Sequence, residues 1–380
     1  MSRRATVALG IDHHRAGRST EAQRCYESIL RYAGHQAQLA AEVHYLLGSL
    51  LVERGELEAG VAHLQIAVRA APMFPRAHVN LGLALLQMGD FQRGWAEYRW
   101  RHNYGVVSAS GGGAPNTVWD GVPLEGRTIV LLPEQGFGDT IQFARYAPLV
   151  AARGGHVIFG CPLALKRLLR TLDGVSQLAS GDDPPVTAHV SAALLDLPAI
   201  FDTRLDNVPA LMPYLHAEPE CVAAWAPRFR TSLFRVGLVW AGNPQHQHDA
   251  RRSTNLDSLA PLADVPGVQF YSLQKPDSNG PPSEFQKLVD LGPDLHDFAD
   301  TAAALMHLDL VITVDTSVAH LAGALGRPVW LLLSRAHDWR WIDGWDRSPW
   351  YPSMRIFRQE VANDWLELAR RVASELAQAK

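Results

Sequence analysis

Leu310–Gly326 reads LVITVDTSVAHLAGALG, and this stretch is the strongest indication of the fold. A short apolar run suited to a buried strand ends at Asp315, and Thr316 and Ser317 then open a helix. Free amides at a helix start can hold a phosphate. Thr316 and His320 are four residues apart and share one helix face. In the alternative interpretation, Asp315 or Thr316 only caps the helix and His320 is a structural core histidine.

Strands and helices alternate on both sides of this stretch, which predicts two Rossmann-like halves with parallel sheets. For the second half we expect helices at 256–263, 301–307 and 317–325, and strands at 235–240, 268–273, 310–314, 329–333 and 355–357, followed by a last helix at 364–379. For the first half we expect strands at 128–132 and 156–160, with a helix at 139–150 that Pro148 ends or kinks.

The loop after the first strand, PEQGFGD at 133–139, contains two candidate carboxylates. Asp139 is either a helix N-cap or a carboxylate facing the cleft at the carboxyl end of a strand, where open α/β sheets bind ligands. Glu134 competes for the second role. The loop begins like a dinucleotide fingerprint, but Ile141 stands where the third glycine is required, so we exclude NAD.

Two further segments supply candidates for ligand contacts. The turn WAGNP at 240–244, with Asn243 and the later Arg252, suits a diphosphate; the alternative is a solvated loop. Gln274, just after the next strand, is a candidate of the same kind. The pair of histidines at 246 and 248 has no carboxylate or cysteine spacing that would indicate a metal. Trp339 and Arg340 lie in a tryptophan-rich segment that either stacks on a sugar or base or packs a domain interface.

The N-terminal part contains an internal repeat. Leu47-Gly48 and Leu81-Gly82 are 34 residues apart, and Leu9-Gly10 precedes the first of these pairs by 38. Another glycine follows seven residues after each of these glycines, at 17, 55 and 89, where a helix–turn–helix needs a positive φ. We therefore expect three helical repeats over 3–103, with a Gly/Ser-rich linker beyond them.

Composition excludes several protein classes. The net charge of −4 is too balanced to predict binding to nucleic acid. Three widely spaced cysteines cannot form a disulfide framework and indicate a reducing compartment. We expect no signal peptide and no membrane span, hence a cytoplasmic protein.

Four segments together resemble bacterial fusions of tetratricopeptide repeats with a glycosyltransferase. They are TVWDGVPLEGRTIVLLPEQGFGDTIQFARY (117–146), RVGLVWAGNP (235–244), DFADTAAALMHLDLVITVDTSVAHLAGALGRPVW (297–330) and DWRW with SPWYPSMRIFRQ (338–359). They are similar to heptosyltransferase-type GT-B enzymes of family 9 and, more distantly, to protein O-GlcNAc transferases. The resemblance implies tetratricopeptide repeats at 3–103, a linker at 104–125, an acceptor-side domain at 126–230, a nucleotide-sugar domain at 231–358 and a helix at 359–380.

The resemblance also implies roles for individual residues. Asp139, after Gly138, becomes the general base. The candidate substrate contacts are Glu134, Gln135, Gly138, Trp339 and Arg340. The donor sugar and its diphosphate are assigned to Asn243, Arg252, Gln274, Asp315, Thr316, Ser317, His320 and Leu321. Heptosyltransferases often have Lys where Val239 precedes Trp240, so an ADP-heptose donor is not implied, and Asn243 or Arg252 is expected to take the phosphate role.

The implied reaction is a single inverting displacement from a nucleotide-diphosphate sugar. No two aspartates stand two positions apart, so a DxD element is absent and no metal cofactor is expected. A protein hydroxyl recruited by the repeats is the expected acceptor. Two alternatives stay open: a catalytically degenerate scaffold that binds protein partners, and a lipopolysaccharide-type transferase.

Overall fold

The computed structural model describes residues 3–31, 36–104, 117–181, 183–184, 186–246, 249–275, 285 and 287–380. The chain divides into two compact units. The repeat unit comprises Met1–Ser108, Asp202–Asp206 and Asp338–Gly344. The α/β unit comprises Ala109–Phe201, Asn207–His337 and Trp345–Lys380. Most of the linker expected at 104–125, namely 105–116, lies outside the described residues.

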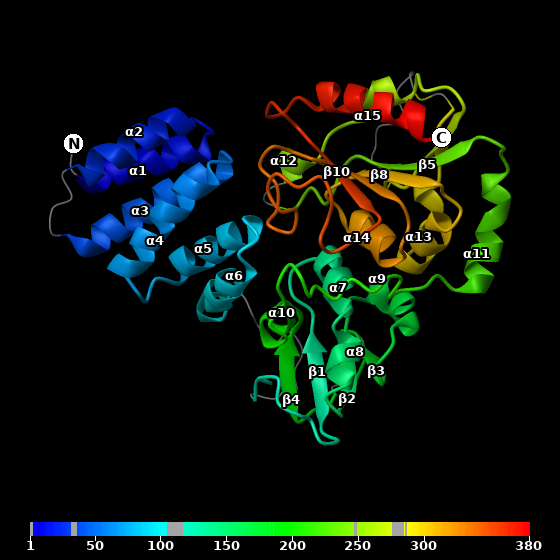
Figure 1. Cartoon of the computed structure of the whole chain (residues 1–380), viewed down its shortest axis with the longest axis horizontal. Coiled ribbons are helices and arrows are strands. Elements are labelled where there is room, and N and C mark those ends of the chain that lie inside the picture. The colour runs from blue at the N-terminus through cyan, green and yellow to red at the C-terminus, as the bar shows by residue number, and fades with distance from the viewer. Residues whose placement is uncertain are drawn as a thin grey trace. The chain divides into compact units, whose positions relative to one another are not determined.

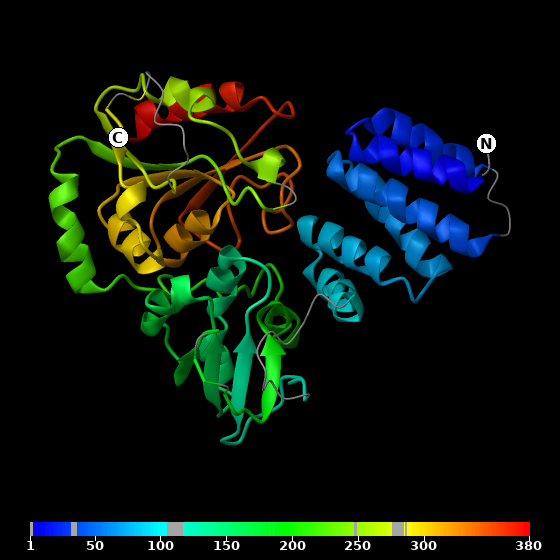
Figure 2. The same ribbon diagram turned by 180° about the vertical axis from the view of Figure 1, so that it is seen from behind.

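Three consecutive helix pairs make up most of the repeat unit (blue to cyan in Figure 1; seen from behind in Figure 2). They are α1 (Arg3–Arg15) with α2 (Ser19–Leu30), α3 (Ala37–Glu53) with α4 (Leu57–Ala70), and α5 (Pro75–Gln87) with α6 (Phe91–Tyr98), followed by the short 3-10 helix η1 (Arg99–Tyr104).

Glycines allow the helices of a pair to turn and to approach closely. A Cβ atom at Gly48 would lie only 2.9 Å from the carbonyl oxygen of Gly60, so the observed approach of the two helices needs a glycine at position 48. The turns contain the three glycines expected to have a positive φ, with values of +73° at Gly17, +80° at Gly55 and +83° at Gly89. The periodic glycines therefore mark the ends of the first helices, as predicted.

The third repeat packs against the two later segments of the repeat unit. The indole N–H of Trp95 donates to the carbonyl of Thr203 at 3.1 Å, and its ring contacts Trp339 edge-on at 5.2 Å between centroids. Trp100 instead stacks on His78 within the array, at 4.1 Å. The fold thus covers the last repeat with segments from much later in the chain.

The first half of the α/β unit is a parallel sheet of order β3-β2-β1-β4. Its strands are β1 (Thr128–Leu132), β2 (His156–Gly160), β3 (Gln177–Ala179) and β4 (Val190–Ala193). Its helices are α7 (Phe137–Ala144), α8 (Ala147–Ala151), α9 (Leu163–Lys166) and α10 (Leu197–Ile200), with 3-10 turns η2 (Leu168–Thr171) and η3 (Leu194–Asp196). α11 (Pro219–Trp225) and η4 (Ala226–Phe229) lead to the second half.

The second half is a parallel sheet of order β10-β9-β8-β5-β6-β7. Its strands are β5 (Phe234–Val239), β6 (Val268–Ser272), β7 (Val289–Asp290), β8 (Leu310–Val314), β9 (Val329–Leu333) and β10 (Met354–Arg358). Its helices are α12 (Asp249–Arg252), α13 (Phe298–Leu305), α14 (Ser317–Ala324) and α15 (Trp365–Ala379), with 3-10 turns η5 (Asp257–Leu262) and η7 (Gly292–Asp294).

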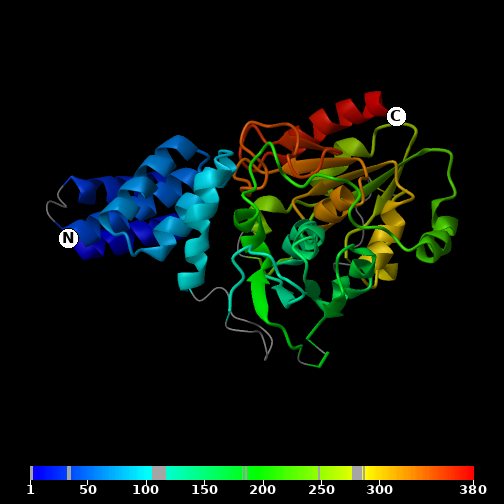
Figure 3. The same cartoon turned by 60° about the horizontal axis from the view of Figure 1, so that its bottom comes forward.

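Helices cover both faces of this second sheet. α15 lies on one face, and α13 and α14 lie on the other (Figures 1 and 3). Leu368, Val372 and Leu376 of α15 are fully buried against strand residues such as Leu238 and Leu332. Both faces of β8 and β9 are buried, which explains their continuous apolar sequences. The predicted fold class, helical repeats followed by a GT-B-like pair of α/β halves, is confirmed.

Two expected helices differ in detail. The helix expected at 139–150 is two helices, because Pro148 is accommodated only in the first turn of α8. The helix expected at 256–263 is the 3-10 turn η5, which contains Pro261. Proline has no backbone N–H and cannot sit inside an α-helix without breaking it.

Candidate active site

Each sheet has a point where the direction of strand addition reverses, and the candidate residues gather there. In the second sheet this point lies between β5 and β8, since the chain adds β6 and β7 on one side of β5 and β8 to β10 on the other. Val239 of β5 pairs with Thr313 of β8, so both strands end at the same level. Open α/β sheets bind ligands at this position.

The start of α14 follows directly after β8. Thr316 is the N-cap residue, with extended φ and ψ of −136° and 169°. Its hydroxyl is buried and bonds to the Thr313 hydroxyl at 3.1 Å, so it supports the strand–helix turn. Asp315 and Ser317 are half-buried on either side. Amides in the first turn of such a helix, aligned with its dipole, favour an anion.

His320 lies one turn into α14 and is 5% exposed. Its Nδ1 atom is 2.9 Å from the hydroxyl of Tyr351. Its opposite edge lies against Gly138, where an added Cβ would be 2.8 Å from Cδ2 and 3.3 Å from Nε2. Leu321 is fully buried and therefore supports the helix from within the core.

Two side chains, those of Gln274 and Arg252, contact the loop after β5. Gln274 accepts from the amides of Trp240 and Ala241, at 3.3 and 3.0 Å. The guanidinium of Arg252 passes so close to Gly242 that a Cβ there would be 2.7 Å from Nη2. Gln274 thus positions the loop through its backbone, and Arg252 occupies the space that glycine leaves.

Two side chains near this loop are already engaged. The Arg252 Nε donates to Asp249 at 3.3 Å, so part of its charge is balanced. Asn243 is exposed and accepts from the amide of Gln245 at 3.0 Å, a local turn contact. Among the residues that the structure describes, no group of three His, Cys, Asp or Glu side chains is placed to hold a metal ion, and the histidine at 248 lies outside them.

In the first sheet the reversal lies between β1 and β4, and the loop 133–138 leaves β1 there. Glu134 is buried, whereas Gln135 is exposed and has a φ of +58°. The carboxylate of Asp139 accepts from the amide of Gly136 at 2.8 Å, in a capping arrangement at the start of α7. Asp139 therefore takes part in capping α7, but from the third helical residue; the N-cap residue is Gly136, not Asp139 as the alternative interpretation expected.

The two halves meet through these same elements. α7 packs on α14 where Gly138 meets His320, and the exposed Phe137 contacts Phe298 of α13 at 5.1 Å between ring centroids. The candidate base at Asp139 and the candidate phosphate site at Thr316 therefore belong to two helices, α7 and α14, that pack against each other.

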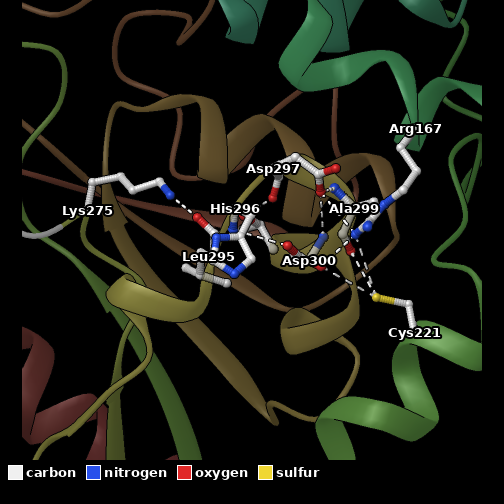
Figure 4. A network of polar contacts seen from close by, with 9 residues as sticks. Arg167, Cys221, Lys275, Leu295, His296, Asp297, Ala299 and Asp300 are labelled. Atoms are coloured by element: carbon white, nitrogen blue, oxygen red, sulfur yellow. Dashed lines mark hydrogen bonds and ion pairs between the residues drawn. The ribbon is translucent and has the colours of Figure 1, made fainter.

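An ion-pair network joins the halves beside this contact (Figure 4). Arg167, after α9, reaches Asp300 at 2.5 Å and Asp297 at 3.1 Å, both in the start of α13. Burial raises the pKa of Asp300, but the hydrogen bond and charge of Arg167 together with backbone hydrogen bonds outweigh burial, and the pKa falls below its ordinary value. The thiol of Cys221 lies 3.7 Å from the same carboxylate. These contacts hold the halves together beside the candidate site.

Trp339 and Arg340 fall in a different compact unit from the other candidate residues. Both belong to the repeat unit and are buried. Trp339 packs on Trp95, and Arg340 pairs with Asp338 at 2.8 Å. Trp339 therefore makes a packing contact inside the repeat unit, and its candidate role in stacking on a sugar or base stays a prediction.

Sequence reasoning missed two buried residues: Tyr351, which contacts His320, and Arg145, which contacts Tyr351. Two signals were present: an arginine inside the apolar run IQFARYA, and Gly323 three residues after His320. Neither signal identifies a partner, because the contacts join residues far apart in the chain.

Comparisons with known proteins agree with this architecture. Residues 7–72 and 45–99 match the tetratricopeptide repeat, and residues 283–362 match glycosyltransferase family 9 (heptosyltransferase). The N-terminal part of the chain is thus similar to tetratricopeptide repeats, and part of its α/β unit is similar to glycosyltransferase family 9. The family 9 match includes the β8–α14 element with Asp315, Thr316 and His320; Asp139 and Arg252 lie outside it.

Protein FlbA of Caulobacter vibrioides is 29% identical over 374 residues, covering 86% of this chain. The chain spans 59% of the length of that relative. Among solved structures, the family 9 glycosyl transferase of Veillonella parvula has a TM-score of 0.49 at 10% identity, covering 68% of this chain and 99% of its own. The O-GlcNAc transferase of Thermobaculum terrenum has a TM-score of 0.32 at 14% identity, covering 99% of this chain and 91% of its own.

Within the described residues, no helix is both long and apolar enough to span a bilayer.

Proposed function

We propose that this chain transfers a sugar from a nucleotide-diphosphate donor to a hydroxyl acceptor at the junction of the two α/β halves. The observation that carries the proposal is the family 9 match over the β8–α14 element, whose helix starts at the reversal point of a parallel sheet. Thr316 and Ser317 provide the helix start, and the loop 240–243 lies beside it at the end of β5. Both features suit a diphosphate.

The reaction is a single displacement at the anomeric carbon. The acceptor oxygen forms a bond to that carbon while a carboxylate takes its proton. The bond between the anomeric carbon and the diphosphate oxygen breaks, and its electron pair leaves with the diphosphate. Attack from the face opposite the leaving group inverts the anomeric configuration.

Two carboxylates compete for the role of base. Asp139 has the position that the family pattern assigns, but its carboxylate already accepts from Gly136. Glu134 is buried at the end of β1, and a carboxylate in such a place gains little solvation from water. We assign the base to Asp139 and treat Glu134 as its direct competitor in the test.

The leaving diphosphate is stabilised by the protein's own groups. Backbone amides at the start of α14 and the guanidinium of Arg252 supply positive potential, with no metal ion required by the proposal. In this proposal Arg252 exchanges part of its contact with Asp249 for the phosphate. Val239 in place of Lys favours a donor other than ADP-heptose.

The acceptor is a protein hydroxyl, and the repeats capture the protein that carries it. A repeat array raises the local acceptor concentration without supplying any reacting group. The three cysteines are unpaired, as a reducing compartment favours, and the proposal places the reaction in the cytoplasm.

A second candidate is a scaffold that has lost catalysis. It is favoured by one pair of observations, the capping bond of Asp139 and the ion pair of Arg252, which give both key side chains structural partners. This candidate predicts binding to protein partners with no turnover of any nucleotide sugar.

A thermal-shift screen with UDP, GDP, ADP and CMP, followed by hydrolysis assays with the matching sugar donors, separates the two. A transferase is stabilised by one nucleotide and slowly hydrolyses its sugar donor. Absence of both stabilisation and hydrolysis across the panel contradicts the proposal and leaves the scaffold.

A further inference from the structure

His320 and Tyr351 form a buried pair that links α14 to the segment before β10. The distance from His320 Nδ1 to the Tyr351 hydroxyl is 2.9 Å, and the rings meet edge-on with centroids 5.7 Å apart. Tyr351 is fully buried and His320 nearly so. A buried hydroxyl in this position fixes the orientation of the imidazole and determines which of its ring nitrogens carries the proton.

Two glycines make room for this pair. A Cβ atom at Gly323 would lie 2.4 Å from Cδ1 of Tyr351, so only glycine lets the phenol ring lie across α14. On the other side, a Cβ at Gly138 would be 2.8 Å from Cδ2 of His320. Gly323 is three residues after His320, so both lie on one helix face. The imidazole is therefore confined between the phenol and the loop after β1.

Arg145 anchors the tyrosine segment to α7. It is 4% exposed and donates to the carbonyls of Trp350 and Gln142, both at 2.8 Å. Its guanidinium carbon is 4.7 Å from the centroid of the Tyr351 ring and 4.8 Å from that of Tyr214. A side chain from the first half thus holds the residue that contacts His320 in the second half.

The phenol keeps its proton, because burial raises the pKa of Tyr351 well above its ordinary value. A phenol proton can be donated to Nδ1. A neutral imidazole that accepts at Nδ1 carries its own proton on Nε2.

We propose that Tyr351 is a positioning residue that holds His320 as the Nε2–H tautomer, with Arg145 anchoring Tyr351, so that the imidazole donates to the diphosphate of the nucleotide donor. The identity of the anion rests on the proposed function. The tautomer of His320 and its dependence on Tyr351 are independent of the proposed function.

The tautomer is measured directly by long-range ¹H–¹⁵N correlation on full-length protein with ¹⁵N-labelled histidine at pH 8. The chain has 16 histidines, so the His320 signals are assigned by their loss in His320→Gln. The wild type is expected to show a proton on Nε2, and Tyr351→Phe, which keeps the ring, is expected to mix the tautomers. Tyr271→Phe is the control, because Tyr271 is also buried but its ring packs on Phe229, 4.7 Å between centroids, so its loss of a hydroxyl should leave His320 unchanged.

A wild-type proton on Nδ1, or an unchanged His320 spectrum in Tyr351→Phe, would overturn the proposal. The wild-type spectrum alone shows which ring nitrogen of His320 carries the proton, even when Tyr351→Phe does not fold.

Calorimetry with UDP, GDP and ADP tests the anion. Tyr351→Phe should weaken the nucleoside diphosphate that binds by about threefold to tenfold. Adding Tyr351→Phe to His320→Ala should cause no further loss, since the hydroxyl acts through the imidazole. Equal affinity in Tyr351→Phe and wild type overturns the role in anion binding. When the tautomer is as stated but no diphosphate binds to the wild type, the proposed function fails and the positioning of His320 stands.

Discussion

Replacing Gly323 with alanine should destabilise the α/β unit, although alanine is the better helix former. The new Cβ would lie 2.4 Å from Cδ1 and 2.5 Å from Cγ of Tyr351. Ordinary carbon contacts begin near ~3.4 Å, so the ring must retreat by about 1 Å. The 2.9 Å bond to His320 then stretches to roughly 3.9 Å, beyond hydrogen-bond range.

The magnitude follows from three contributions. Overpacking of a core costs about 1–3 kcal/mol, and losing the hydrogen bond costs about 0.5–1.5 kcal/mol. Helix propensity returns about 1 kcal/mol. We expect a net loss of about 0.5–3.5 kcal/mol in the free energy of unfolding.

The assay is amide hydrogen exchange of the α14 peptide over a urea series, which reports on this region of a chain with two units. The matched background is Tyr351→Ala, in which the ring is absent and Gly323→Ala should be neutral or stabilising. An equal cost in both backgrounds would refute the reasoning, because the destabilisation would not come from Tyr351.

Three further outcomes are expected. Thr316→Ala and His320→Ala should each weaken nucleoside diphosphate binding by roughly tenfold to a hundredfold, measured by calorimetry; unchanged affinity in both would move the donor site elsewhere. Burial lowers the pKa of both His44 and His63, whose Nδ1 atoms are 2.8 Å apart, so the repeat array should be fully stable above about pH 6.5 and lose stability as the pH falls through the lowered pKa values. Circular dichroism melts at pH 8 and pH 5 test this, and a pH dependence that persists with both histidines changed to Gln contradicts it. Arg15→Glu, on an exposed site of the first repeat, should slow modification of the protein acceptor without changing donor hydrolysis, whereas an unchanged acceptor rate removes that surface from acceptor capture.

Local and periodic signals predicted most of the architecture. The glycines at 17, 55 and 89 need a particular backbone conformation, so their spacing alone locates the repeat turns. The strand β8 and the start of α14 were predicted correctly, since an apolar run that ends in Asp-Thr-Ser carries both signals within eight residues. Elements marked by such local signals can be predicted without knowing which other elements pack against them.

Tertiary partners could not be predicted from the sequence. Arg145 contacts the carbonyl of residue 350, 205 positions away, and nothing local to either residue indicates the pair. Trp339 is aromatic and lies within the residues that match family 9, but it packs on Trp95 in the repeat unit. A tryptophan that stacks on a ligand and one that packs a core have the same local sequence, so only the fold distinguishes them.

The most direct test of the central claim is the rate of sugar transfer by full-length protein and by its carboxylate variants, with the nucleotide sugar found in the screen and acceptor proteins from a cell lysate. Asp139→Asn keeps a side-chain oxygen that can accept from the amide of Gly136, so the fold and donor binding should persist while the rate falls by about 10²–10⁴-fold. Glu134→Gln serves as the matched control and should retain most of the activity. Transfer by Asp139→Asn at the wild-type rate would contradict the assignment of the base, and no transfer by the wild type with any donor would contradict the account as a whole.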